Sequence, residues 1–219
     1  MGRIASLFSG FRRPRKSPPS EPEEARAVVS WVVAGLGNPG KEYAGSRHNT
    51  GYLVLDRIAR AQHVHFGRRR FQGATGEAEI SGQRVLLVKP ETYYNRSGDC
   101  ISALLGYFKV PPERLIVIHD ELDLEPGRIR LKSGGGDAGN NGVRSVVRSL
   151  GTPDFIRVRI GVGKPPPGNA DHRHILEPVG PGGTGDSDPV LERAAQAVEA
   201  IVTHGLARAM GQYNQRAEP

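Results

Sequence analysis

The chain has 219 residues, 37% of them hydrophobic and 24% charged, a balance typical of one soluble domain with a tail. Its apolar runs, such as residues 85–88 and 115–118, stop after about four residues, whereas a membrane span needs about 18, so an integral membrane protein is excluded. A single cysteine and no secretory leader favour a reducing, cytoplasmic compartment, and a net charge of +7 favours an anionic partner such as nucleic acid.

The first 30 residues differ in composition from the remainder. Four basic residues lie among four prolines between positions 12 and 22, which favours an extended, solvated chain, so we place residues 1–30 outside the fold. A disordered basic arm that adds attraction to RNA is the favoured interpretation. Two alternatives stay open: the lipidation pattern M-G-x-x-x-[ST] at residues 1–6, and an Arg-rich amphipathic leader built on Ile4, Leu7, Phe8 and Phe11.

From residue 31 onward, short apolar segments alternate with segments of helical periodicity. Strands are expected at 31–36, 71–80, 84–89, 115–119 and 155–162, with Ser81-Gly82 as a hairpin turn. Helices are expected after residue 52, near 101–108, at 143–150 and, as one last helix, at 190–210. This order predicts an α/β fold, a single three-layer α/β/α domain over residues 31–212 with a mixed, mostly parallel twisted sheet, and a C-terminal tail at 213–219. Functional loops should follow the carboxyl ends of its strands.

The glycine-rich segment 35–40 reads GLGNPG and satisfies G-x-G-x-x-G after a strand, with Asp56 near the place of a ribose-binding acid. A dinucleotide site would need free backbone N–H groups where a helix begins directly after the glycines. Pro39 lacks such a group, and the polar stretch 41–47 delays the helix. We therefore disfavour a nicotinamide cofactor and expect a tight turn that places Asn38 at the edge of the sheet.

His48 and Asp120 are the main candidates for acid–base chemistry. His48 follows the glycine-rich loop, and Asp120 ends the predicted strand 115–119. His48 and Asn49 could instead cap the next helix, and Asp120 could be exposed at a strand end. If the strand order brings Asp120 against His48, the carboxylate fixes the imidazole tautomer and makes His48 a competent general base near neutral pH. The sequence alone leaves this contact open.

Other hydrolytic designs find little support. There is no G-x-S-x-G segment, and Cys100 lies in a helical pattern, which indicates a packing residue. Histidines at 63 and 65 and at 172 and 174 are spaced two apart, and H-E-x-x-H is missing, so we expect no metal and no cofactor. A base that acts directly on water remains, with side-chain amides at Asn38, Asn95 and Asn141 to orient a carbonyl substrate.

Several blocks of the sequence together resemble one family. They are GLGNPG at 35–40 with Tyr43 and RHN at 47–49, PETYYNRSG at 90–98, HDELDL at 119–124, GGG at 134–136 leading to Asn141-Gly142, and RVRIGVG at 157–163. In this order, over about residues 32–163, the chain is similar to bacterial-type peptidyl-tRNA hydrolases. The combination is far more specific than any single block.

The resemblance implies hydrolysis of the ester bond between a peptide, or an N-blocked aminoacyl group, and the 3′-terminal ribose of tRNA. This reaction recycles tRNA from peptidyl-tRNA that ribosomes release early. In family terms His48 is the general base and Asp120 orients it. The remaining implied roles are positioning of water and peptide carbonyl by Asn38 and Asn95, contact with substrate by Tyr94 and Asn95, a tRNA-facing wall at Tyr43, and a mobile lid segment at Asn141.

Specificity for tRNA requires phosphate contacts. Arg130 and Lys132 alternate along one face of an extended stretch after Gly127, and Arg144 and Arg148 share a helix face, so these cations could follow a phosphate backbone. Lys41 and Arg47 are further candidates. We expect strong salt dependence, peptidyl-tRNA as the partner, no membrane or protein partner, and a monomer.

Three departures from the family pattern stand out. The family usually has histidine at Asn140 and methionine at Tyr94, and it has a more regular apolar pattern in place of the Gly-, Pro- and Asp-rich stretch 177–189. Asn140 cannot titrate, and Tyr94 places a rigid ring beside the expected peptide channel. The alternative function is therefore a weakly catalytic or non-catalytic RNA-binding paralogue on this fold, as with the plant chloroplast splicing factors that resemble these hydrolases.

Overall fold

The computed structural model describes residues 28–44, 46–164 and 188–215. They build a seven-stranded mixed sheet with the strand order β2-β3-β4-β1-β5-β7-β6. The four strands β4, β1, β5 and β7 are parallel neighbours, and β3, β2 and β6 pair antiparallel at the two sides. The strands are β1 Trp31–Gly35, β2 Arg68–Arg70, β3 Gly73–Ile80, β4 Gln83–Pro90, β5 Leu115–Glu121, β6 Ile129–Ser133 and β7 Ile156–Gly161.

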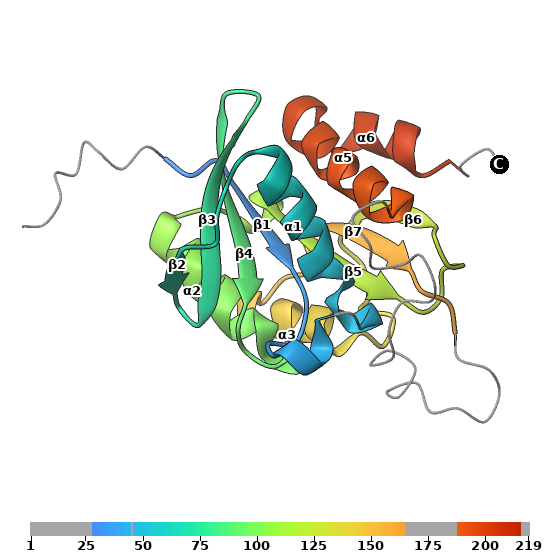
Figure 1. Cartoon of the computed structure of the whole chain (residues 1–219), viewed down its shortest axis with the longest axis horizontal. Coiled ribbons are helices and arrows are strands. Elements are labelled where there is room, and N and C mark those ends of the chain that lie inside the picture. The colour runs from blue at the N-terminus through green and yellow to red at the C-terminus, as the bar shows by residue number, and fades with distance from the viewer. Residues whose placement is uncertain (1–27, 45, 165–187, 216–219) are drawn as a thin grey trace, which may run out of the picture.

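Helices cover both faces of the sheet (Figure 1). On one face, α1 (Thr50–Ala61), α5 (Pro189–His204) and α6 (Leu206–Tyr213) pack on one hydrophobic cluster. On the other face, α2 (Ser97–Phe108) and α3 (Asn141–Leu150) pack on a second cluster. The structure therefore confirms the predicted three-layer α/β/α domain.

The central strands are apolar because helices cover both of their faces. All residues of β1 and β5 are buried. Val33 and Ile116 lie in the cluster under α1 and α5, whereas Val32 and Val117 lie in the cluster under α2 and α3. This period of two, combined with continuous hydrophobicity, is typical of parallel strands buried on both sides.

Two glycines bring the start of α1 against the central strands. A Cβ atom on Gly35 would lie 2.2 Å from the carbonyl oxygen of Gly51, and one on Gly51 would lie 2.5 Å from the carbonyl oxygen of Ile118. Only hydrogen atoms fit in these gaps, so the backbone of α1 approaches β1 and β5 closely. The segment just before α1, which contains His48, is thereby held beside the carboxyl end of β5.

The structure also corrects several boundaries. The expected single helix at 190–210 is two helices, because Gly205 takes φ 83° and ends α5. Strand β2 was not predicted. Tyr213 is buried and ends α6, and the Asn214 side chain accepts a hydrogen bond from Leu131 N–H at 2.6 Å, so the folded domain reaches past the expected boundary at 212.

Other expectations are confirmed or fall outside the described residues. Ser81 and Gly82 both have positive φ, as the predicted hairpin turn requires. Of the tail predicted at residues 1–30, residues 1–27 lie outside the described residues, as does most of the stretch 177–189. The predicted boundary at residue 30 is too late, because Val29 is buried in the cluster under α2 and α3 and the Ser30 N–H donates to the Arg84 carbonyl at 2.8 Å. None of the described helices is both long enough and apolar enough to cross a membrane.

Candidate active site

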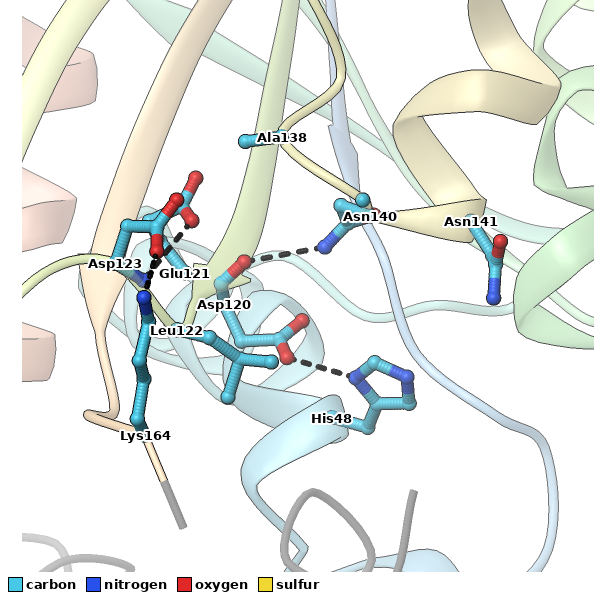
Figure 2. A pocket seen from close by; sticks show the side chains of 10 residues that line it. His48, Asp120, Glu121, Leu122, Asp123, Ala138, Asn140, Asn141 and Lys164 are labelled. Carbon is cyan, nitrogen blue, oxygen red and sulfur yellow. Dashed lines mark hydrogen bonds and ion pairs between the residues drawn. The ribbon is translucent and has the colours of Figure 1, made fainter. Parts of the chain in front are cut away.

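A cavity of about 630 Å³ lies at the carboxyl end of β5, where parallel sheets place their ligand sites (Figure 2). The end of β5 and the segment after it, the loop before α3, the turn that precedes α1 and Lys164 in the segment after β7 all contribute to its wall. Its lining residues are His48, Asp120, Glu121, Leu122, Asp123, Ala138, Gly139, Asn140, Asn141 and Lys164.

His48 and Asp120 are in contact. The sequence left this contact open, because it depends on the order of the strands. The Nδ1 atom of His48 lies 2.8 Å from Oδ2 of Asp120, and the Asp120 side chain is only 2% exposed. Burial alone would raise the pKa of Asp120, but the His48 ring and then the Tyr94 hydroxyl bring it below its ordinary value. An ionised carboxylate only accepts, so Nδ1 carries the proton, and Nε2, which points away from Asp120 in Figure 2, is left as the basic nitrogen.

Tyr94 meets the same carboxylate from its other side. Its hydroxyl donates to Oδ1 of Asp120 at 2.6 Å, and its ring stacks on His48 with centroids 3.8 Å apart and planes 9° from parallel. Tyr94 is only 4% exposed, so its hydroxyl faces Asp120 and not the cavity. Burial, followed by the charge of Asp120, raises the pKa of Tyr94 well above its ordinary value. A substrate contact by Tyr94 stays a prediction.

Asn38 is locked against the turn that carries His48. Its backbone N–H donates to Oδ1 of Asn49 at 2.8 Å, and the Asn49 amide donates back to its carbonyl at 3.0 Å. The Asn38 side-chain oxygen accepts from the Tyr94 N–H at 2.9 Å, which leaves its amino group as a donor, and Asn38 lines a separate cavity of about 290 Å³. Asn49 occupies the N-cap position of α1 without a side-chain capping bond, so the capping alternative does not describe its side chain.

Asn141 and Asn95 are exposed and share a second cavity of about 360 Å³. Asn141 lines both this cavity and the one around His48, so the two are neighbours. The other residues of the second cavity are Arg96, Arg144, Ser145 and Arg148. Tyr43 is half-buried and lines a different cavity of about 370 Å³, together with Thr92 and Tyr93. Among these predicted residues the structure therefore brings only Asn141 to the wall of the His48 cavity.

Arg130 and Lys132 lie on β6, where the predicted alternation is confirmed, since Ile129 and Leu131 point into the core. In the antiparallel register they face Arg159 and Arg157 of β7 directly. Burial, followed by the charges of those two arginines, lowers the pKa of Lys132. We call Arg130, Lys132, Arg157 and Arg159 the β6–β7 strip. It does not line the His48 cavity.

Three kinds of site were disfavoured from the sequence: a dinucleotide site at the glycine-rich segment, a cysteine nucleophile and a metal site. The glycine-rich segment is followed by two 3-10 turns, Lys41–Tyr43 and Arg47–Asn49, and α1 begins only at Thr50, so no α-helix begins directly after the glycines. Cys100 is buried within α2, and burial raises the pKa of its thiol to about 12. Among the described residues, no group of three or more His, Cys, Asp and Glu side chains is placed to hold a metal ion.

The sequence analysis missed part of the cavity wall. Asp123 and Lys164 form an ion pair at 2.8 Å on that wall, beside Leu122. Asp123 could have been found from its place in the HDELDL block directly after Asp120, whereas nothing in the sequence places residue 164 or residue 94 next to residue 120. The Tyr94–Asp120 bond is a product of the tertiary fold.

Comparisons with known proteins agree with this geometry. The profile of the family described as peptidyl-tRNA hydrolase matches residues 32–219. The chain is 43% identical over 185 residues to the peptidyl-tRNA hydrolase of Anaeromyxobacter sp. (strain K), covering 84% of this chain and 96% of that one. It is 42% identical over 188 residues to that of Symbiobacterium thermophilum, covering 85% and 100%.

Solved structures give the same result. The crystal structure of peptidyl-tRNA hydrolase from Acinetobacter baumannii is similar with a TM-score of 0.78 and 36% identity, covering 85% of this chain and 95% of that one. A peptidyl-tRNA hydrolase complex with N-propanol is similar with a TM-score of 0.80 and 34% identity, covering 88% and 98%. By sequence and by fold, the chain belongs to the peptidyl-tRNA hydrolase family.

Proposed function

We propose that the protein hydrolyses the ester bond between a peptide, or an N-blocked aminoacyl group, and the 3′-terminal ribose of tRNA. The observation that carries the proposal is the 2.8 Å contact between His48 Nδ1 and Asp120 Oδ2 on the wall of a cavity, in a chain of this family. By this reaction the protein recycles tRNA from peptidyl-tRNA that is released before translation ends.

His48 is the general base in this proposal. Its Nδ1–H is held by Asp120, so Nε2 has a free lone pair and takes a proton from a water molecule as that water attacks the ester carbonyl carbon. The attack forms a C–O bond and a tetrahedral oxyanion. Asp120 stays ionised and stabilises the imidazolium that forms.

Side-chain amides would stabilise the oxyanion. Asn38 offers its amino group because its oxygen is already bonded to Tyr94 N–H, and its backbone is fixed by Asn49. Asn95 and Asn141 are exposed beside the cavity and would position the peptide carbonyl and the attacking water. A donor that is fixed before the reaction stabilises developing charge without reorganisation, which is why the locked amide of Asn38 suits the step.

The ester then breaks at the ribose oxygen. The imidazolium of His48 returns its proton to that oxygen, which leaves as the tRNA 3′ hydroxyl, and the peptide leaves with a carboxyl group. An alkoxide from ribose is a better leaving group than an amine, so one histidine–carboxylate pair with oriented amides is sufficient, and the tethering of the substrate supplies much of the rate.

Binding of the tRNA would use the cations outside the cavity. The β6–β7 strip offers Arg130 and Lys132, and Arg144 and Arg148 line the neighbouring cavity together. These charges would contact phosphates and so position the acceptor end without reading base sequence. Lys41, which begins the preceding turn, and Arg47, which begins the His48 turn, are further candidates.

The test is release of a labelled N-acetyl-aminoacyl group from tRNA, with tRNA binding measured in parallel by filter binding. The wild type should cleave without added metal, and His48→Ala should lower kcat by about 10³-fold while the Kd for tRNA changes less than about twofold. His65→Ala, the same change at an exposed histidine outside the cavity, should behave as wild type.

Two results would contradict the proposal. Full turnover by His48→Ala would rule out the mechanism. Tight tRNA binding without any cleavage by the wild type would favour the alternative, a non-catalytic RNA-binding protein on this fold.

A further inference from the structure

A chain of hydrogen bonds runs from the N-terminus of α3 to the catalytic pair. The Val143 backbone N–H donates to Oδ1 of Asn140 at 3.0 Å, and Nδ2 of Asn140 donates to the Tyr94 hydroxyl at 2.9 Å. The Tyr94 hydroxyl reaches Oδ1 of Asp120 at 2.6 Å, and Oδ2 of Asp120 reaches Nδ1 of His48 at 2.8 Å. One side chain from each of four segments is thus linked in series.

The direction of every bond in this chain is fixed by its first member. A backbone N–H can only donate, so Asn140 must turn its oxygen to Val143 and its amino group to Tyr94. Because Tyr94 accepts from Asn140, its own proton points to Asp120. The same amino group also donates to the Asp120 carbonyl at 3.1 Å, drawn as a dashed line in Figure 2.

The Tyr94 ring is held as firmly as its hydroxyl. One face stacks on His48, and a Cβ atom on Gly142 would lie only 2.5 Å from the ring, so α3 presses against it. The Tyr94 backbone N–H is bound by Asn38. The ring is therefore fixed in position and holds the His48 imidazole by stacking on it.

We propose that Tyr94, oriented by Asn140, is a positioning residue that fixes the rotamer of Asp120 and the basicity of His48. Its hydroxyl shares the negative charge of Asp120, so that less of this charge stabilises the imidazolium, and its ring sets the plane of His48. The effect on turnover rests on the proposed function, whereas the effect on the His48 titration does not. This chain of hydrogen bonds thereby couples the N-terminus of α3, where Asn141 lies, to His48.

The charges around this network are paired among themselves. On β5 and β7, Glu121 pairs with Arg159 at 2.9 Å, and Arg157 donates to the carbonyls of Gly134 and Gly136. The remaining pairs near the cavity, α3 and the Tyr94 turn are Lys164–Asp123, Arg144–Asp137 and Arg96–Asp99. Arg47 precedes His48, and burial lowers the pKa of His119, so its ring is neutral. None of these pairs includes the Tyr94 hydroxyl, so we expect them to persist when it is removed.

The first test is Tyr94→Phe, which keeps the ring and removes the hydroxyl. Asp120 then holds its charge for the imidazolium alone, so the acidic limb of the kcat/KM profile should move to higher pH by about half a unit to one unit. The plateau of kcat should fall about tenfold, because Asp120 loses one of its two anchors, while KM changes less than about twofold.

Two further variants and one control sharpen the test. Asn140→Ser keeps an oxygen that caps α3 and removes the Nδ2 amino group that donates to Tyr94, so it should move the limb in the same direction by less. Tyr94→Leu removes ring and hydroxyl and should lower kcat more than Tyr94→Phe. Tyr93→Phe removes an exposed hydroxyl one residue away and should leave the profile unchanged.

A readout without turnover separates this inference from the proposed function. NMR titration of the His48 imidazole should give a midpoint that is higher in Tyr94→Phe than in wild type by about half a unit to one unit. If wild type does not cleave, the proposed function fails and this titration still decides on the network. A folded Tyr94→Phe protein with the wild-type midpoint and the wild-type limb overturns the inference, even if its thermal stability is lower.

Discussion

The carboxyl end of β5 and the neighbouring β6–β7 strip differ in how their charged side chains are paired. At the carboxyl end of β5, Asp120 is buried, and each of its oxygens accepts a hydrogen bond, from His48 and from Tyr94. On the β6–β7 strip, Lys132 lies directly opposite Arg157 and Arg130 lies directly opposite Arg159, an arrangement of like charges that destabilises a sheet. The first region is satisfied internally, and the second keeps an excess of positive charge.

This difference separates the requirements of chemistry from those of binding. A base and its carboxylate must hold one geometry, and a buried carboxylate whose two oxygens are both bonded provides it. A surface for a polyanion needs unneutralised cations, whose mutual repulsion is relieved when phosphates bind. At the opposite side of the sheet β2 is also basic, but Arg68 and Arg69 pair there with Glu77 and Glu91. On the strip, only Arg159 has a carboxylate partner among the described residues, namely Glu121, and Arg157 is buried against glycine carbonyls, so the accessible positive charge is that of Arg130 and Lys132.

The largest expected effect on kcat comes from Asp120→Asn, which disrupts the hydrogen bonds around Asp120. Tyr94 must donate to the new side chain, so the amide turns its oxygen to Tyr94 and its amino group to His48. His48 Nδ1 then accepts, Nε2 carries the proton, and the base is lost, so kcat should fall by about 10³- to 10⁴-fold with tRNA affinity unchanged. Asp99→Asn, at an exposed ion pair, is the control, and a loss below about tenfold would contradict this account.

The next effect tests the strip. Arg130→Ala with Lys132→Ala should weaken tRNA binding about tenfold at moderate salt and reduce the slope of log Kd against log salt by about two, because two phosphate contacts are lost. The kcat at saturating substrate should not change. Arg68→Ala with Arg69→Ala removes the same charge from β2 and should change the slope much less. Equal slopes for the two double variants would mean that only net charge matters.

The smallest expected effect is a pH dependence of the free energy of unfolding that comes from His119, beside Asp120. Burial lowers the pKa of His119, whose Nδ1 lies 2.7 Å from the Asp120 carbonyl, so the unfolded chain binds a proton that the folded one rejects. The contribution of His119 is thus complete above about pH 6.5 and is lost as the pH falls below it, by at most about 1.4 kcal/mol for each pH unit.

Urea unfolding between pH 5 and 8 measures this slope. His119→Asn keeps a donor near the Asp120 carbonyl and should flatten the curve, whereas His204→Asn, at an exposed site, should not. A wild-type curve that is flat through pH 6.5 would show that His119 does not report on the buried network.

Local pattern predicted most of the fold. The buried runs of β1 and β5, the Ser81-Gly82 turn and the helical spacing of α1 to α3 depend on neighbours in sequence, so they could be read from it. The break at Gly205 was missed because a glycine inside a helical pattern either continues or ends a helix, and only packing of α6 decides between them. Strand β2 consists of three arginines and has no apolar pattern to find.

The candidate site, like the fold, has features that local sequence determines and features that only the tertiary structure determines. The sequence by itself determined which residue types are available and in which order, including a histidine after the glycine-rich loop, a carboxylate at the end of a strand and alternating cations on β6. The tertiary structure alone decided that Asp120 contacts His48, which is 72 positions away, and that Tyr94 and Asn140 complete the carboxylate's bonds. The physical reason is that strand order and the close approach of Gly51 to β5 set these distances, and neither leaves a mark in local sequence periodicity.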